Sequence, residues 1–367
     1  MDVLLHIGPA KTGSTSIQKT LNGFDDGVTK YLEFQKDNTK IFNNKPWNHS
    51  QFIKYIFEES FFKKFNTKNS IGSHDAKSLR ASLEADFKKE ITRSDKKKII
   101  ISGEGLGFLK GSAIKKLKFF LEHNNCNIQI FAFYRDPQNK LVSKLQQTSK
   151  GKAFSLLDSS FKGWIPRPID VTLAGWAKHF PKEKISVHNF YKEDLVNGCA
   201  VETFCSFAKV KPINKDNTSN QSMSFSALRL IYSMNQILNK EGIDKSNRRK
   251  FHRLIRDIYN DEDKIDKKLF KDILDVAEFS NEKKFLKECT TFLQSKKDEP
   301  RYHHNGTSIF KRLKLKYARF TLHKELQNLK NIDFDIIDKN LERLGKKPSE
   351  ISALSSREKI IALYKEV

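Results

Sequence analysis

The sequence predicts an α/β fold, with a central parallel sheet flanked by helices and a helical C-terminal region after it. Short apolar runs typical of buried strands recur through the first 190 residues. Helical patterns lie between these runs, and beyond residue 224 only helical spacing remains. Because strands that alternate with helices are joined in parallel, we expect helices on both faces of the sheet.

The first strand is predicted at the amino terminus. Residues 3–7 are apolar and are followed at once by Gly8 and Pro9, which end a strand in a tight loop. Three later runs have the same character and span 98–102, 128–134 and 185–190. Each of them predicts a further strand.

A helix is predicted from Ser14 onward. Thr15 and Gln18 have the spacing of a capping box, and Ile17 and Leu21 share one helical face. Further helical patterns span 114–122 and 141–148. After Ser224, apolar residues recur at helical spacing: Phe225, Leu228, Ile231, Met234, Leu238, Phe251, Leu254, Ile255, Ile258, Leu269, Phe270, Ile273 and Leu274.

Composition divides the chain into three parts. The polar stretch 214–220 separates an α/β domain, residues 1–215, from a helical region, residues 216–300, that completes the fold or a binding site. A second break at 296–307 precedes a basic helical extension, residues 301–367. The stretch 301–325 interleaves Lys and Arg with apolar residues, as in a helix that packs against the domain or contacts an acidic polymer or anionic membrane.

The chain is strongly basic. It has 68 Lys and Arg against 44 Asp and Glu, a formal net charge of +24, which favours anionic partners. Biased codon use in an AT-rich genome would produce the same excess of lysine, so both explanations stay open.

Cysteines and the amino terminus predict a cytoplasmic protein. The four cysteines show no metal-ligand spacing and no disulfide framework, as expected of free thiols in a reducing compartment. The first apolar run stops at Gly8, too early for a signal peptide, and no stretch reaches the ~18 apolar residues of a membrane span.

The segment that joins the first strand to the first helix has the composition of an anion-binding loop. It reads HIGPAKTGSTSIQ, and its two glycines allow the backbone to curl so that amide groups and the helix N-terminus face an anion. Lys11 adds a positive charge, and hydroxyl donors come from Thr12, Ser14, Thr15 and Ser16. The loop is P-loop-like but departs from Walker A, because Lys11 precedes Gly13 instead of following it.

A second segment, FAFYRDPQNKLVS at 131–143, joins another strand to a helix. Asp136 and Pro137 suit the first positions of that helix, so Arg135 lies at a helix N-terminus that favours anions. With both segments in this order, roughly residues 1–240 resemble the sulfotransferases that use 3′-phosphoadenosine 5′-phosphosulfate (PAPS), especially their bacterial carbohydrate-type branch. Lys140 departs from the arginine that relatives often carry.

The resemblance implies how the donor binds. The loop would hold the 5′-phosphosulfate of PAPS, and Arg135 and Ser143 would hold its 3′-phosphate. The loop residues that it assigns to the donor are Gly8, Lys11, Thr12, Gly13, Ser14, Thr15 and Ser16. No metal is required by this chemistry, and no acidic cluster in the sequence indicates one.

Transfer to a hydroxyl needs a general base. Glu104 follows the strand at 98–102, and sites in parallel sheets form at the carboxyl ends of strands. His49 is the second candidate, since bacterial relatives often have a histidine after the second strand. A solvated or capping role for Glu104 and an ordinary loop position for His49 are the alternatives, whereas His6 is expected to be packed in its strand.

The function that these features predict is transfer of a sulfuryl group from PAPS to the hydroxyl of a glycan or other carbohydrate-containing acceptor, with Glu104, Lys11 and His49 as catalytic candidates. No specific nucleic acid partner is expected, and the basic C-terminal region is the part suited to contact an anionic membrane. The alternatives are a P-loop kinase or NTPase, and a non-catalytic basic protein that binds nucleic acid or anionic membrane.

Overall fold

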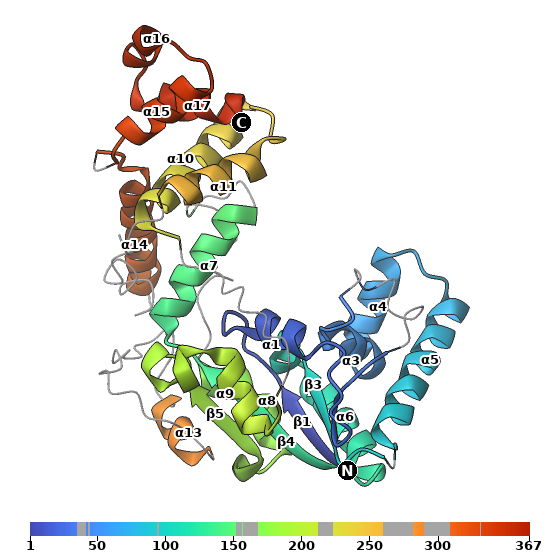
Figure 1. Ribbon diagram of the computed structural model, residues 1–367. Coiled ribbons are helices and arrows are strands. Elements are labelled where there is room, and N and C mark those ends of the chain that lie inside the picture. The colour runs from blue at the N-terminus through green and yellow to red at the C-terminus, as the bar shows by residue number, and fades with distance from the viewer. Residues whose placement is uncertain are drawn as a thin grey trace. The chain divides into compact units, whose positions relative to one another are not determined.

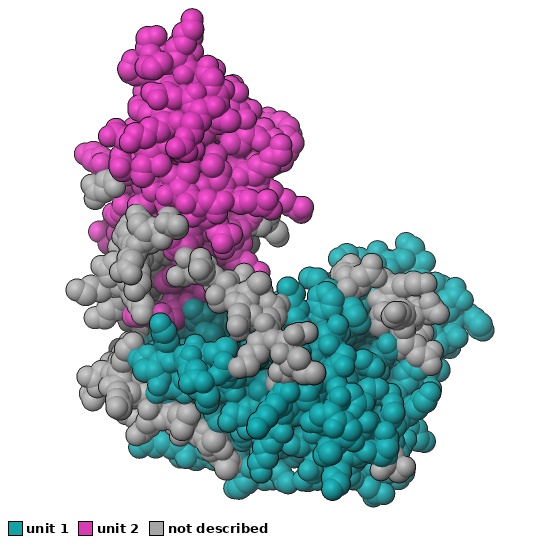
Figure 2. All heavy atoms as spheres, viewed as in Figure 1, with its two compact units in different colours: residues 1–136, 167–219, 279–301 teal, residues 137–166, 220–278, 302–367 magenta. Residues whose placement is uncertain are grey.

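The computed structural model describes residues 1–34, 42, 45–93, 95–151, 156, 168–211, 223–259, 282–289, 309–330 and 332–367. The chain forms two compact units, each built from three stretches of sequence (Figure 2). Unit 1 comprises residues 1–136, 167–219 and 279–301, and unit 2 comprises residues 137–166, 220–278 and 302–367. This division differs from the predicted boundaries, because the chain leaves the first unit and returns to it.

Unit 1 contains a five-stranded parallel sheet of order β2-β3-β1-β4-β5 (Figure 1). The strands are β1 (Asp2–His6), β2 (Thr29–Tyr31), β3 (Lys98–Ser102), β4 (Asn127–Tyr134) and β5 (Ile185–Asn189). Four of them confirm the predicted strands. The edge strand β2 was not predicted, because three residues are too few to show a pattern.

Helices cover both faces of this sheet. The helices of unit 1 are α1 (Ser14–Leu21), α3 (Ser50–Phe57), α4 (Glu59–Lys68), α5 (Ser73–Ile91), α6 (Gly111–His123), α8 (Ile169–His179), α9 (Ala200–Ala208) and α13 (Glu282–Glu288). Short 3-10 turns are η2 (Glu104–Phe108), η4 (Lys182–Lys184), η5 (Lys192–Asp194) and η6 (Val196–Gly198).

Alternation along the strands decides which helix packs where. In β1, Val3 and Leu5 join the core formed with α3, α5, α6 and α8, whereas Leu4 joins the core formed with α1 and α9. Fully buried Ile17 of α1 and Phe204 of α9 complete the second core. The predicted α/β class, with a parallel sheet between helices, is confirmed.

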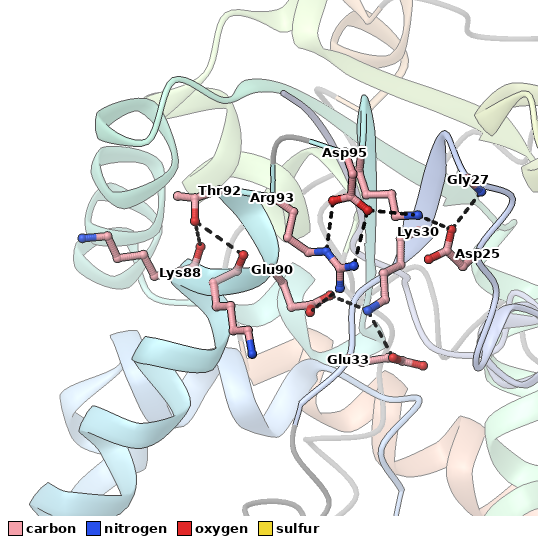
Figure 3. Close-up of polar contacts among 11 residues, drawn as sticks. Asp25, Gly27, Lys30, Glu33, Lys88, Glu90, Thr92, Arg93 and Asp95 are labelled. Atoms are coloured by element: carbon pink, nitrogen blue, oxygen red, sulfur yellow. Dashed lines mark hydrogen bonds and ion pairs between the residues drawn. The ribbon is translucent and has the colours of Figure 1, made fainter.

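The edge strand β2 is held by an ion-pair network (Figure 3). The Lys30 ammonium lies 2.9 Å from a carboxylate oxygen of Glu90, at the end of α5, and both side chains are almost buried. Arg93 lies 3.4 Å from Glu90 and 3.2 Å from Asp95, and Asp95 lies 3.4 Å from Lys96. Because buried charges need partners, this network ties β2 to the helix that leads into β3.

The regular secondary structure among the described residues of unit 2 is all helical. Its helices are α7 (Pro137–Gly151), α10 (Phe225–Glu241), α11 (Arg248–Ile258), α14 (Ile309–Gln327), α15 (Asp335–Arg343), α16 (Pro348–Ser352) and α17 (Ser356–Glu366). The α7 helix belongs here because it packs on α10: the Gln146 amide donates to the Met223 carbonyl at 2.9 Å, and the Asn235 amide donates to the Ser149 carbonyl at 2.8 Å. No helix among the described residues is long and apolar enough to cross a membrane.

The basic stretch near residue 310 is helical, as predicted, and forms α14. Its buried face carries Ala318, Leu322 and Leu326, and α14 packs on α10. Tyr317 and Phe320 instead lie on the exposed side, with Tyr317 69% exposed. The interleaved apolar residues therefore do not all share one buried face.

Several predictions fall outside the described residues. They concern the polar linker at 214–220, the break at 296–307 and the apolar positions Leu269, Phe270, Ile273 and Leu274.

We expect Phe131→Ala to lower the free energy of unfolding by about 3–5 kcal/mol. Phe131 of β4 is fully buried, and its ring meets those of Phe133 and Phe204 at centroid distances of 4.9 and 5.1 Å. Phe119→Ala on α6, where the ring is 67% exposed, should change the free energy of unfolding by less than about 0.5 kcal/mol. Urea unfolding followed by circular dichroism measures both, and equal losses would contradict the described core.

Candidate functional site

The loop between β1 and α1 curls through three left-handed residues. Gly8, Lys11 and Gly13 have φ values of 91°, 74° and 72°. Gly13 is the N-cap of α1 and has no side chain with which to cap the helix. The predicted start of the helix at Ser14 is confirmed, but the capping box is not its cause, because Gln18 is buried and the chain enters the helix through left-handed Gly13.

Two of the predicted hydroxyl donors brace the loop internally. The Thr12 hydroxyl donates to the Pro9 carbonyl at 2.6 Å, and the Ser14 hydroxyl donates to the same oxygen at 3.3 Å. Thr12 is fully buried, whereas Thr15 is exposed and Ser16 half-buried. Thr12 and Ser14 therefore stabilise the loop from within. Thr15 and Ser16 are the hydroxyl side chains that stay exposed or half-buried.

Two glycines of the loop are in close contact with neighbouring backbone and side chains. A Cβ on Gly8 would lie 3.0 Å from the Cα and carbonyl oxygen of Glu104, and one on Gly13 would lie 2.8 Å from the Cβ of Ala200. In addition, the Phe133 amide donates to the Gly8 carbonyl at 3.0 Å. Only glycine fits at both positions, and the loop is held against η2, α9 and β4.

The carboxyl end of β4 brings Arg135 to this loop. The Arg135 guanidinium donates to the carbonyl of Lys11, and it lies over the ring of Phe190 at 5.2 Å from the centroid. Burial lowers the pKa of Arg135 to about 10, and the adjacent Asp136 carboxylate opposes that shift, so the guanidinium is charged at neutral pH. The two segments that resemble a donor site therefore meet in space.

Lys11 interacts electrostatically with two other predicted site residues. Burial lowers the pKa of Lys11, the Glu104 carboxylate opposes this shift, and the Arg135 guanidinium adds to it. Two cations and one carboxylate thus share a partly desolvated environment, where charges interact more strongly than in water. Such a site can bind an anion at its cations and accept a proton at its carboxylate.

Glu104 is half-buried at the start of η2, immediately beyond the carboxyl end of β3. Neighbouring amides fix its position: the Gly103 amide donates to the His6 carbonyl at 2.9 Å, and the Gly105 amide donates to the Ser50 hydroxyl at 2.9 Å. The turn that carries Glu104 is therefore attached to both β1 and α3.

His49 occupies a structural position. Its ring is fully buried against Tyr31, and its Nδ1 accepts a hydrogen bond from the Ser102 amide at 3.0 Å. Burial lowers the pKa of His49 to about 3, so the ring is neutral. The two candidates for a general base thus differ in exposure, since Glu104 is half-buried and His49 is fully buried.

His6 is packed in its strand, as predicted. Its Nδ1 lies 2.7 Å from the Ser102 hydroxyl, and its ring contacts Phe131 and Phe204. Burial lowers the pKa of His6 to about 3.

Ser143, the predicted partner of Arg135, lies on α7 in unit 2. Of the two residues predicted to bind the 3′-phosphate, Arg135 therefore belongs to unit 1 and Ser143 belongs to unit 2. Phe190, whose ring lies against the Arg135 guanidinium, was not predicted as a site residue. The only sequence feature that indicates it is its place at the end of a predicted strand. Within the described part of the chain, no group of three or more His, Cys, Asp or Glu side chains is arranged to hold a metal ion.

Fold and site define an α/β protein with a cationic, glycine-bounded loop at the carboxyl edge of a parallel sheet. Comparison of the chain with models of protein families finds no match, and neither curated proteins nor solved structures match it.

His6 and His49, both fully buried, predict a loss of stability in mild acid. Both are neutral when folded, with pKa values of about 3, and both bind protons near pH 6.5 once unfolded. Because the unfolded chain then holds more protons, the free energy of unfolding falls as pH decreases from 6.5 toward 3, by up to about 1.4 kcal/mol per pH unit for each histidine.

Urea unfolding at pH 7.5, 6.0 and 5.0 measures this slope. His49→Gln, whose amide oxygen can accept the bond from Ser102, should show a shallower slope than the parent. The same slope in both proteins would show that His49 does not contribute.

Proposed function

We propose that this protein is a PAPS-dependent sulfotransferase with a P-loop-like donor site, and that its acceptor is a hydroxyl of a glycan or other carbohydrate-containing molecule. The observation that carries the proposal is the contact between Arg135 and the Lys11 loop. Two strand ends that are far apart in sequence come together with their cations, as a donor with phosphates at two positions requires.

The residues present suit such a donor. The left-handed Lys11 and Gly13 and the packed Gly8 keep the loop curled, and the uncapped start of α1 favours an anion. Arg135 is partly buried, charged and in contact with the ring of Phe190, which suits a bidentate contact with a phosphate. In this proposal the loop holds the 5′-phosphosulfate, and Arg135 holds the 3′-phosphate.

The reaction would proceed in one displacement at sulfur. Glu104 takes the proton of the acceptor hydroxyl, whose oxygen forms a bond to sulfur while the bond from sulfur to the bridging phosphate oxygen breaks. Lys11 and the loop amides stabilise the charge that develops on the leaving oxygen. The products are a sulfate ester and adenosine 3′,5′-bisphosphate, with the proton left on Glu104.

Donor recognition distinguishes this proposal from a kinase or NTPase. Adenosine 3′,5′-bisphosphate should raise the melting temperature of the parent protein, because it binds only the folded state, and ATP with Mg²⁺ should not. If ATP with Mg²⁺ raises the melting temperature and adenosine 3′,5′-bisphosphate does not, the proposal is wrong. Mass spectrometry of glycans and small alcohols incubated with labelled PAPS then detects transfer directly.

We expect Arg135→Lys to weaken binding of adenosine 3′,5′-bisphosphate by about 10- to 100-fold, because lysine keeps the charge and loses the fork that fits a phosphate. Binding of adenosine 5′-monophosphate should change by less than about threefold, since this ligand lacks the 3′-phosphate. Isothermal titration calorimetry measures both affinities. Equal losses for the two ligands would assign Arg135 to the other end of the donor.

We expect Glu104→Gln to lower kcat by about 10²- to 10⁴-fold, because the amide cannot accept the proton. Affinity for adenosine 3′,5′-bisphosphate should be unchanged within about twofold. Glu84→Gln, at an exposed position of α5, is the matched control and should retain the parental rate. A parental kcat in the Glu104 variant would exclude this residue as the base.

A further inference from the structure

A lysine that sequence reasoning did not single out lies beside the turn that carries Glu104. Lys54 is on α3, and its ammonium nitrogen is 3.6 Å from the position that a Cβ on Gly105 would occupy. The turn and the helix are in close contact here, since a Cβ on Gly103 would also lie 2.6 Å from the Ser50 hydroxyl oxygen. The Lys54 ammonium is therefore next to the residue that follows the proposed base.

The Lys54 ammonium has few interactions that offset its partial removal from water. Lys54 is half-buried, and among the residues that the structure describes it makes no hydrogen bond and no ion pair within 4 Å. Its nitrogen lies 6.0 Å from the ring centroid of Phe61. Burial lowers the pKa of Lys54, and the carboxylate of Glu58 one turn away opposes that shift. A partly desolvated cation without a hydrogen-bonded partner is unfavourable until an anion reaches it.

The same turn exposes an aromatic ring. Phe108 ends η2, four residues after Glu104, and is 52% exposed. An exposed aromatic face offers an apolar platform for the C–H face of a sugar ring. This turn thus carries a carboxylate and an exposed aromatic ring, and the Lys54 ammonium lies beside its second residue, Gly105.

We propose that Lys54 binds an anionic substituent of the acceptor, so that the acceptor is an acidic glycan with a carboxylate or sulfate close to the hydroxyl that Glu104 deprotonates. This inference rests on the proposed function, because it assigns the acceptor side of the same site. The anionic group would provide the hydrogen-bonded partner that the chain does not, and it would orient the hydroxyl toward the base.

Three probes separate the possible anions: a hexasaccharide of glucuronic acid and N-acetylglucosamine, the same hexasaccharide with its carboxyls reduced to alcohols, and the reduced form sulfated at those alcohols. Affinity is measured by titration calorimetry, and kcat/KM is measured with PAPS. The parent should prefer at least one anionic form to the reduced form by about 10- to 100-fold, the range of a charge-assisted hydrogen bond.

Lys54→Met keeps the length and apolar stem of the side chain and removes its charge. We expect it to abolish the preference for the anionic form and to leave the reduced form unchanged within about threefold. Lys54→Arg should restore most of the preference, and Lys64→Met, on the exposed surface of α4, should leave it intact. An unchanged melting temperature and unchanged affinity for adenosine 3′,5′-bisphosphate show that the variants are folded with the donor site preserved.

The outcomes separate this inference from the proposed function. If the parent transfers sulfate and Lys54→Met keeps the preference, or if the parent binds the anionic and neutral forms equally or binds none of them, the role of Lys54 is wrong. If the parent binds an anionic form through Lys54 and transfers no sulfate to any probe, the anionic site stands and the sulfotransferase proposal fails.

Discussion

The contact between the Arg135 guanidinium and the main-chain carbonyl of Lys11 joins two loops that leave neighbouring strands. It exists because β1 and β4 are parallel neighbours, so that their carboxyl ends reach the same edge of the sheet. A partly buried guanidinium needs acceptors, and here one acceptor is the backbone of the loop itself. The loop conformation and the position of the cation thus depend on each other.

Close packing also restricts the conformation of the Lys11 loop at this edge of the sheet. Gly8 has no room for a side chain because the backbone of Glu104 lies against it, and Thr12 and Ser14 use their hydroxyls to hold the Pro9 carbonyl. Rigid elements that hold a charged loop reduce the reorganisation that a bound anion would require. The desolvation of Lys11 has the same origin, since the side chain shares this packed edge with Arg135 and Glu104.

Parts of the site were predictable from local sequence, and others were not. The glycines around Lys11 and the position of Arg135 after a strand predicted an anion site, because loop composition and strand ends are local features. The choice between Glu104 and His49 was not local. It depends on burial, and His49 is buried because its ring packs on Tyr31 and its Nδ1 accepts from the Ser102 amide. A polar residue between apolar segments gives no sign of such a contact.

By itself, the sequence determined four strands and the helical character of the described residues after 224, since each follows from the spacing of neighbouring residues. Only the tertiary structure decided the strand order, the edge strand β2, the membership of α7 in unit 2 and the place of Lys54 beside the turn of Glu104. These features arise from contacts between residues far apart in the chain. Strand pairing and helix packing select such contacts, and no periodicity within one segment encodes them.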